Sequence, residues 1–367
     1  MMPKDIYSYI KTEENRFLTE YIQVGDNWQW NFREHVQLLF HLKNGVFFTG
    51  SNEWKTMLRV FKNIMEPILN LSYWAEDIEV KDVIFFIENA RGRVLSFLIK
   101  KYHDDVYVKE HDLDTLFDEI TESDVDYGGV LVQRSRFPRP DVLPLNTIAF
   151  CDQTDMLGAP ISFKLNMSPS ALKKMSKKGW GLPANGATTS IEDLIVLATS
   201  EKAPDGTVQT KKNDSTGKNI EIYVVYGGLP ESYLYNEANT EDYCSQVQIV
   251  GFYKDKKNEK KGVTLYRKRE EDSYLLFHTS KKVHGRALGR GVGESVLHPQ
   301  IWTNFLEIHK MQMLEAASKV PLYTDDQSYA NRNKIQDMEN LEITVVEDGK
   351  QIRQVPTAAV ANIQLFE

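Results

Sequence analysis

The sequence predicts an α+β fold, and three observations support that prediction. Apolar residues recur every three or four positions through most of residues 1–123, the period of helices, and alternate with polar residues after Tyr127, the period of strands. A cluster of glycines then precedes the longest helical pattern in the chain. Near the end, Asp348 and Gly349 join two alternating runs, as the turn of a β-hairpin does.

The first part, residues 1–123, is predicted to be helical. Helical periodicity predicts helices over residues 32–42, 54–71, 83–102 and 112–121. Ser51 or Asn52 suits the N-cap of the second helix, and Pro67 falls near its end, where it would kink or stop the helix.

The second part, residues 124–284, is predicted to be rich in strands. Alternation predicts strands over residues 130–135, 146–153, 219–227, 246–254, 262–269 and 273–280. Their spacing favours an antiparallel meander. Short helices are predicted over residues 168–178 and 190–200, and the polar stretch near 200–218 is predicted to be an exposed insertion.

A glycine turn and a long helix follow over residues 285–320. The glycines are Gly285, Gly289, Gly291 and Gly293, and we expect Gly289 or Gly291 to adopt a positive φ that sets the entry angle of the helix. The helix is predicted to begin at Pro299, because a first turn does not need the missing N–H, and to end at Ser318.

The same glycines leave an alternative open, since backbone N–H groups before a helix can cradle a phosphate. A nucleotide-binding enzyme that uses the Gly285–Gly293 turn is therefore the rival interpretation. The spacing lacks the last gap of the dinucleotide-binding fingerprint, and no Gly-Lys-Ser/Thr ending is present. These departures favour a turn built for close packing.

The long helix carries apolar residues on two adjoining faces, more than one core contact requires. Such a helix is deeply buried or lies between neighbours, so we expect it to contact other copies of the chain. The predicted contact residues are Ile301, Trp302, Phe305, Ile308 and Met313.

Residues 321–356 are predicted to form a small clip-like strand pair around Asp348 and Gly349. A further helical pattern begins in residues 357–367 and stops within a few turns, which predicts that the sequence is a fragment of a longer protein.

Composition limits the chemistry. A length of 367 residues predicts two domains or more, and a net charge of −8 argues against a protein that simply coats nucleic acid. Cys151 and Cys244 are interpreted as reduced thiols. No stretch is apolar enough to predict a membrane span. No nucleophile elbow or metal-ligand spacing is present, so the chain is predicted not to be an enzyme and to hold no cofactor or metal.

One local excess of positive charge is a candidate contact surface for nucleic acid or an acidic partner, although solvated hairpin tips explain most such runs. It lies between residues 251 and 290. The candidate residues are Lys256, Lys257, Lys260, Lys261, Arg267 and Arg269.

Three stretches resemble the portal proteins of tailed bacteriophages, most closely the long portals of crAss-like phages. The first, YGGVLVQRSRFPRPDVLPLNTIAFCDQTD, is similar to the strands of the portal wing. The second, GRGVGESVLHPQIWTNFLEIHKMQMLEAASKVPL, is similar to the glycine turn and long stem-like helix, including Gln300 and Asn304. The third is the strand pair and new helix after Asn340. The resemblance implies that the part missing from this sequence would be the C-terminal stem, tunnel-loop and crown region of such portals.

The resemblance implies a structural role in the virion. It implies a ring of identical subunits, a dodecamer, that assembles in the bacterial host cytoplasm and lies at one capsid vertex as the head–tail connector. DNA would pass through the channel during packaging and ejection, and terminase, the tail adaptor and the major capsid protein would dock on the ring. A non-viral scaffold protein of helices and strands is the remaining alternative.

Overall fold

The structure, a computed structural model, describes residues 6–26, 28–45, 62–76, 83–87, 92–134, 139–199, 219–235, 242–254, 260–270, 274–318, 322–323 and 353–354. Helices and antiparallel sheets are mixed along these residues, which confirms the α+β class. The chain divides into two compact units, Met1–Val46 with Met65–Leu297 and Phe47–Ile64 with His298–Glu367. The change of period near Tyr127 therefore falls inside the first unit and does not separate compact units.

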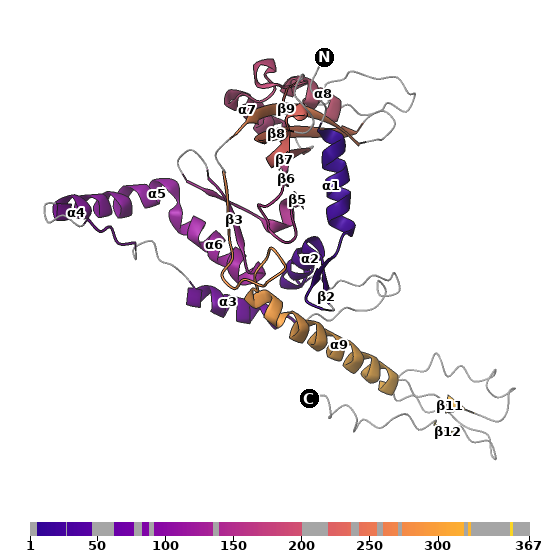
Figure 1. The fold of residues 1–367 in the computed structure, drawn as a ribbon. Helices are drawn as coiled ribbons and strands as arrows, with labels where there is room; N and C mark the ends of the chain where they lie inside the picture. Colours follow the sequence, from indigo (N-terminus) through magenta and orange to yellow (C-terminus); the bar gives the residue numbers. More distant parts are fainter. Residues whose placement is uncertain are drawn as a thin grey trace, which may run out of the picture. The chain divides into compact units, whose positions relative to one another are not determined.

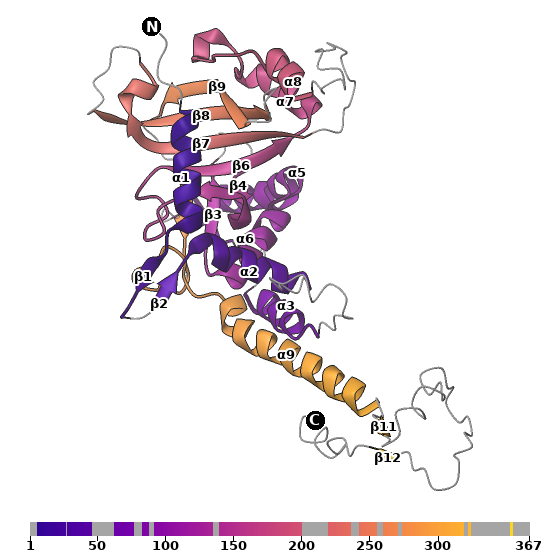
Figure 2. The same ribbon diagram turned by 90° about the vertical axis from the view of Figure 1, so that its right-hand side faces the viewer.

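The first unit is built around a five-stranded antiparallel sheet in the order β5-β6-β7-β8-β9. Figure 2 shows β6, β7, β8 and β9 side by side in this order. Its strands are β5 (Ile148–Phe150), β6 (Ile161–Met167), β7 (Ile220–Pro230), β8 (Tyr243–Lys254) and β9 (Lys260–Arg269). Strands adjacent in sequence are adjacent in space, so the predicted meander is confirmed for β7, β8 and β9. The predicted strand over 273–280 also forms, as β10 (Leu275–His278), but it belongs to a different sheet.

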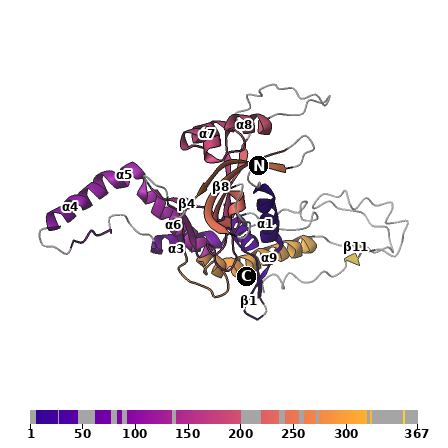
Figure 3. The same ribbon diagram turned by 45° about the horizontal axis from the view of Figure 1, so that its top comes forward.

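Helices cover both faces of the sheet. Side chains alternate between faces along a strand, so neighbouring residues of β8 point in opposite directions. At Gly251 the missing side chain leaves room for Leu194 of α8 (Ile191–Thr199), while the ring of Phe252 lies 5.9 Å from that of Tyr7 in α1 (Tyr7–Thr19). Figure 3 shows α1 and α8 on opposite sides of β8. A short helix, α7 (Pro169–Met175), packs beside α8.

A second, three-stranded antiparallel sheet has the order β10-β3-β4. It consists of β3 (Val130–Gln133), β4 (Asp141–Leu143) and β10 (Leu275–His278), so β10 pairs with β3 and not with the meander. A small hairpin of β1 (Ile22–Val24) and β2 (Trp28–Trp30) lies between α1 and α2 (Phe32–Lys43).

The other helices of the first unit are α3 (Met65–Glu76), α4 (Arg93–Tyr102), α5 (Val108–His111) and α6 (Leu113–Tyr127). A π-helix, His103–Tyr107, joins α4 to α5, and Asp112 then adopts a left-handed φ of 50° before α6 begins. Figure 1 shows α4, α5 and α6 following one another as an arm that leads away from the sheets.

The long helix α9 (Val292–Ser318) starts in the first unit and continues in the second. In the second unit, β11 (Leu322–Tyr323) pairs with β12 (Arg353–Gln354). The structure thus pairs the predicted region around 353–354 with residues just after the helix. The predicted partner strand near 341–347, the insertion near 200–218 and the final helix over 357–367 lie outside the described residues.

Three predicted helix boundaries are wrong. Residues 62–64 are not helical and α3 begins at Met65, which puts Pro67 in a first turn where its missing N–H costs little. Residues 83–87 are not helical either, and α4 begins only at Arg93, directly after Gly92. A Cβ on Gly92 would lie 2.3 Å from the Ile87 side chain, so the glycine lets the preceding segment lie close to α4.

The third boundary is that of α9, which begins at Val292 and contains Pro299 in its interior. Packing around the glycine turn sets this start, and Glu294 places an acidic side chain in the first turn, where the helix dipole favours it. No helix among the described residues has the length and apolar character needed to cross a membrane.

Candidate functional site

The glycine turn is the candidate site, because it joins several elements through main-chain contacts. A Cβ on Gly291 would lie 2.7 Å from the Gly128 nitrogen and 2.8 Å from the Val125 carbonyl oxygen. A Cβ on Gly293 would lie 2.4 Å from the Asp126 carbonyl oxygen. The end of α6 therefore packs directly on the backbone of the turn and on the start of α9.

The predicted positive φ is wrong for both Gly289 and Gly291. Among the described residues, left-handed glycines of this region are Gly285, with φ 87°, and Gly128, with φ 76°. Gly289 and Gly291 are instead required by close approach, since a Cβ on Gly289 would lie 2.6 Å from the Gly128 oxygen. The sequence identified important glycines but assigned two of them the wrong physical reason.

The N–H groups of the turn are already used within the chain. Gly289 donates to the Gly128 carbonyl at 3.1 Å, and Arg290 donates to the Lys281 carbonyl at 2.9 Å. A phosphate cradle needs several N–H groups that point at the ligand. Here carbonyl oxygens face Gly289, Gly291 and Gly293, so the geometry gives no support to the nucleotide-binding alternative.

A buried ion pair braces the turn from inside. The Arg286 side chain is fully buried and donates to Glu294 at 2.6 and 3.1 Å, which ties the turn to the first turn of α9. It also donates to the carbonyls of Leu288 and Gly289 at 3.0 and 2.8 Å. Its guanidinium stacks 5.2 Å from the Trp28 ring and 5.5 Å from the Trp30 ring. Arginine suits this position because its planar fork binds a carboxylate and two carbonyls while stacking on indoles.

His35 lies against this ion pair and titrates abnormally. Its Nε2 is 3.8 Å from Glu294, too far for a hydrogen bond, and is buried. Burial lowers the pKa of His35 to about 4, Glu294 opposes that shift, and the Arg286 charge adds to it. The imidazole is therefore neutral at pH 7.

We expect acid to destabilise the protein through His35. The imidazole in the unfolded chain binds a proton near pH 6.5, whereas the folded one does so only near pH 4. Folding therefore loses up to about 3 kcal/mol of stability as the pH falls from 6.5 to 4. Urea unfolding of wild type and of His35→Gln across this range tests it. The variant should lose less stability on acidification, and equal slopes would show that His35 is not responsible.

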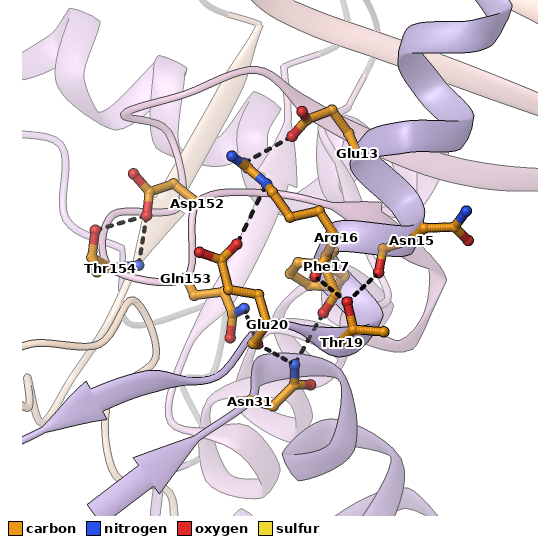
Figure 4. Close-up of polar contacts among 10 residues, drawn as sticks. All are labelled: Glu13, Asn15, Arg16, Phe17, Thr19, Glu20, Asn31, Asp152, Gln153 and Thr154. Carbon is orange, nitrogen blue, oxygen red and sulfur yellow. Dashed lines mark hydrogen bonds and ion pairs between the residues drawn. The ribbon is translucent and has the colours of Figure 1, made fainter.

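Two buried amides hold the elements that support the turn (Figure 4). Asn31 caps α2 by accepting from Glu34 N–H, and its Nδ2 donates to the carbonyls of Phe17 and Glu20. Gln153 donates to Glu20 O at 2.8 Å and accepts from Phe32 N at 3.0 Å.

The main-chain carbonyl of Gln153 also accepts from Ala287 N at 2.7 Å. One residue thus joins the end of α1, the start of α2 and the glycine turn.

A second charged cluster surrounds Asp126, near the end of α6. Asp126 is buried and accepts from Lys43 at 2.6 Å and from the Tyr73 hydroxyl. Lys43 also binds Glu122 at 2.5 Å. Burial raises the pKa of the Asp126 carboxyl, and the two hydrogen bonds act in the opposite direction. This cluster fixes α2 and α3 to the end of α6.

In the second unit, α9 holds residues 62–64, which have no regular secondary structure, through two fully buried amides, Gln300 and Asn304. Gln300 accepts from Ile64 N and donates to Lys62 O, both at 2.8 Å, as a neighbouring strand would. Asn304 accepts from Lys62 N at 3.3 Å and from Gln300 at 3.1 Å. The Gln-and-Asn pattern of the sequence therefore serves to bind main chain.

We expect Gln300→Leu to release this segment. Loss of the side-chain amide leaves buried main-chain groups without these partners, which costs about 1–3 kcal/mol. Hydrogen exchange should accelerate at Ile64 N–H, which donates to Gln300. The control is Glu307→Gln, which removes only an exposed ion pair with Lys62 at 3.4 Å and should change exchange little. Unchanged protection in Gln300→Leu would contradict the assignment.

The predicted contact residues on α9 are partly exposed. Trp302 is 68% exposed and Phe305 43%, whereas Ile301 and Ile308 are half-buried. The side chain of Met313 lies outside the described part of the structure. Helix α9 thus turns polar amides to its own chain and two large rings to solvent.

The predicted basic surface is divided by its own contacts. Arg267 is buried and donates to the carbonyls of Gly186 and Tyr233, so the prediction that it contacts a partner is wrong. Lys260 binds Glu221 at 2.5 Å and lies over the rings of Tyr223 and Phe252.

Of the other basic residues, Arg269 lies 3.9 Å from Glu231 and Lys261 is exposed on the β9 edge. Lys256 and Lys257 lie outside the described residues.

Sequence patterns did not reveal the Arg286–Glu294 pair or the Gln153 network. An arginine among glycines looks like a solvated residue, and Gln153 lies over a hundred residues from its partners. Within the described ranges, no three His, Cys, Asp or Glu side chains are grouped as metal ligands, and Cys151 and Cys244 are free and buried. Comparison of the sequence with protein-family models and with curated proteins gives no match.

Proposed function

We propose that the chain is a portal-type structural subunit that forms a ring of identical copies. The observation that carries the proposal is that two sides of α9 make different contacts. One side binds the chain's own main chain through Gln300 and Asn304, while Trp302 and Phe305 remain exposed. A helix whose inner side binds its own chain and whose outer side exposes large rings suits contact with a neighbouring copy.

The remainder of the proposal extends the resemblance to portals. The ring would lie at a capsid vertex of a tailed bacteriophage, conduct DNA during packaging and ejection, and bind terminase, the tail adaptor and the major capsid protein. It would have no catalytic role and need no cofactor. The main-chain packing of the glycine turn supports this, because it favours a rigid helix root over a ligand cradle.

Electron microscopy of the purified protein tests the proposal. Rings with a central channel are expected in negatively stained images, and light scattering should give a mass many times that of one chain. A monodisperse monomer at micromolar concentration would overturn the proposal. Open filaments would preserve self-association but remove the closed ring.

We expect Trp302→Glu to weaken assembly. Burial of a large apolar side chain contributes about 1.5–3 kcal/mol, so each interface should weaken by roughly one to two orders of magnitude. Light scattering should show a lower mass with unchanged circular dichroism, since Trp302 is largely exposed within its own subunit. The control is Leu276→Glu on β10, where another apolar side chain is 48% exposed. Equal effects of both variants would argue against a specific contact at α9.

A further inference from the structure

Helix α4 presents its apolar side to solvent and its polar side to its own chain. Ser96 donates to the Phe85 carbonyl, and Lys100 donates to the Val83 carbonyl at 2.8 Å, so the preceding segment covers the polar side. No residue of α4 is buried. Its apolar side chains are exposed by 39–69%, and these are Val94, Leu95, Phe97, Leu98 and Ile99.

The segment before α4 extends this apolar surface. Ile84 and Phe86 flank the carbonyl-bonded Phe85, and each is 83% exposed. An exposed apolar patch of this extent on a folded protein marks an interaction site. We call this surface, formed by Ile84, Phe86 and the apolar residues of α4, the α4 face.

Charge gives the α4 face a specific character. Helix α4 contains three basic residues and no acidic one. Arg93 and Lys101 lie four positions before and after Phe97, so they flank the Phe97 ring along one row of the helix. The α4 face is therefore an aromatic knob between two cations.

The same chain carries a pocket with the complementary character. It lies between α2, α6 and the residues after β4, and its volume is about 260 Å³. Its lining combines apolar groups such as Phe40, Val142 and Pro144 with three carboxylates, Glu119, Glu122 and Asp126. Lys43 also lines the pocket and binds Glu122 and Asp126, so the lining has an excess of negative charge. Small-molecule sites are usually about 300–1,000 Å³, so this smaller pocket suits an inserted side chain better than a ligand. Helix α6, which supplies all three carboxylates, has six acidic residues and no basic one.

We propose that the α4 face of one copy binds the α2–α6 pocket of a second copy, with Phe97 inserted and Arg93 and Lys101 beside Glu119 and Glu122. The two surfaces lie on different elements of one chain, and Figure 1 shows α4 at the far end of the arm from the end of α6. Contacts between different patches are head-to-tail, and they close into rings when the rotation permits. The inference rests on the proposed ring and specifies one of its contacts.

Substitution at Phe97 tests the contact in the intact chain. Phe97→Glu should weaken self-association at least tenfold by analytical ultracentrifugation, with unchanged thermal unfolding because Phe97 is 66% exposed. Val196→Glu on α8, where the side chain is 48% exposed, is the matched control and should assemble normally. Unchanged assembly of Phe97→Glu overturns the inference and leaves the ring proposal intact. If the wild-type protein forms assemblies other than rings and Phe97→Glu dissociates them, the inferred contact is supported and the ring proposal is overturned.

Charge reversal and cross-linking identify the occupant. Lys101→Glu should weaken assembly, and Glu119→Lys in the same chain should restore it. A photoreactive residue at position 98 should cross-link to an α6 peptide from another copy in a mixture of isotope-labelled and unlabelled protein. Cross-links confined to one chain overturn the inference. The inference is also overturned if the α4 face binds anionic lipid vesicles and Phe97→Glu has no effect on self-association. A wild-type protein that is monomeric would overturn both the inferred contact and the ring proposal.

Discussion

Gly128→Ala should lower the free energy of unfolding by about 2–5 kcal/mol. A left-handed φ costs a non-glycine residue about 1–2 kcal/mol, and Gly128 has φ 76°. A Cβ there would also lie 2.5 Å from Gly291 N and 2.7 Å from the carbonyl carbon of Gly289, and overpacking costs about 1–3 kcal/mol. Chemical denaturation of the purified variant measures the sum.

Two further alanine variants separate the causes. Gly25 has φ 70° with nothing within 4 Å of its Cβ position, so Gly25→Ala should show the conformational cost alone. Gly291→Ala should show the crowding cost alone, because Gly291 does not have a positive φ but faces Gly128 N and Val125 O. If Gly128→Ala costs no more than Gly25→Ala, a Cβ at Gly128 does not crowd the main chain of Gly289 and Gly291.

Arg286→Met should destabilise the protein by about 3–5 kcal/mol, because it leaves Glu294 without its buried partner. The variant also leaves the Leu288 and Gly289 carbonyls without the donors they have here and removes the stacking on Trp28 and Trp30. Urea unfolding followed by tryptophan fluorescence reports both the stability and the environment of the two indoles.

The double variant Arg286→Met/Glu294→Met provides the control for this prediction. Replacing both partners of a buried ion pair by apolar residues is often neutral, so the double variant should be more stable than Arg286→Met. The exposed pair of Arg16 with Glu13 at 2.8 Å gives the opposite reference, since Arg16→Met should cost less than about 1 kcal/mol. A double variant as unstable as the single one would assign the loss to the carbonyl and stacking contacts.

The elements that the sequence predicted correctly are those in which the apolar residues of the pattern are the residues buried in the structure. Helix α2 falls where helical spacing placed it, because one face of it packs on the core. Strands β7, β8 and β9 fall where their apolar runs placed them, although successive residues of β7 and β8 are buried on both faces of the sheet. Strand β6 was missed although Ile161, Phe163 and Leu165 alternate with polar residues, so its signal was present. The hairpin of β1 and β2 was missed because strands of three residues give too little pattern.

Boundaries and contacts at long range were predicted less well. Residues 83–87 have the same apolar spacing as α4, yet they are not helical, and Ser96 and Lys100 of α4 donate to the carbonyls of Phe85 and Val83. The glycines of the turn were recognised from sequence, but their close approach to Gly128 joins residues more than 160 positions apart. Periodicity reports which face of a local element is buried and carries no information about such partners.

The glycines of this protein should differ in whether genetic suppression is possible. At Gly251 the obstructing atom is Leu194 Cδ2, at 2.3 Å, so a harmful alanine there should be rescued by shortening Leu194. At Gly128, Gly289 and Gly291 the nearest atoms all belong to the main chain. No change of a neighbouring side chain removes a main-chain atom, so revertants at these positions should restore glycine itself. We therefore expect the glycines of the turn to stay glycine during evolution, whereas in the sheet a substitution at Gly251 can be compensated by a second substitution at Leu194.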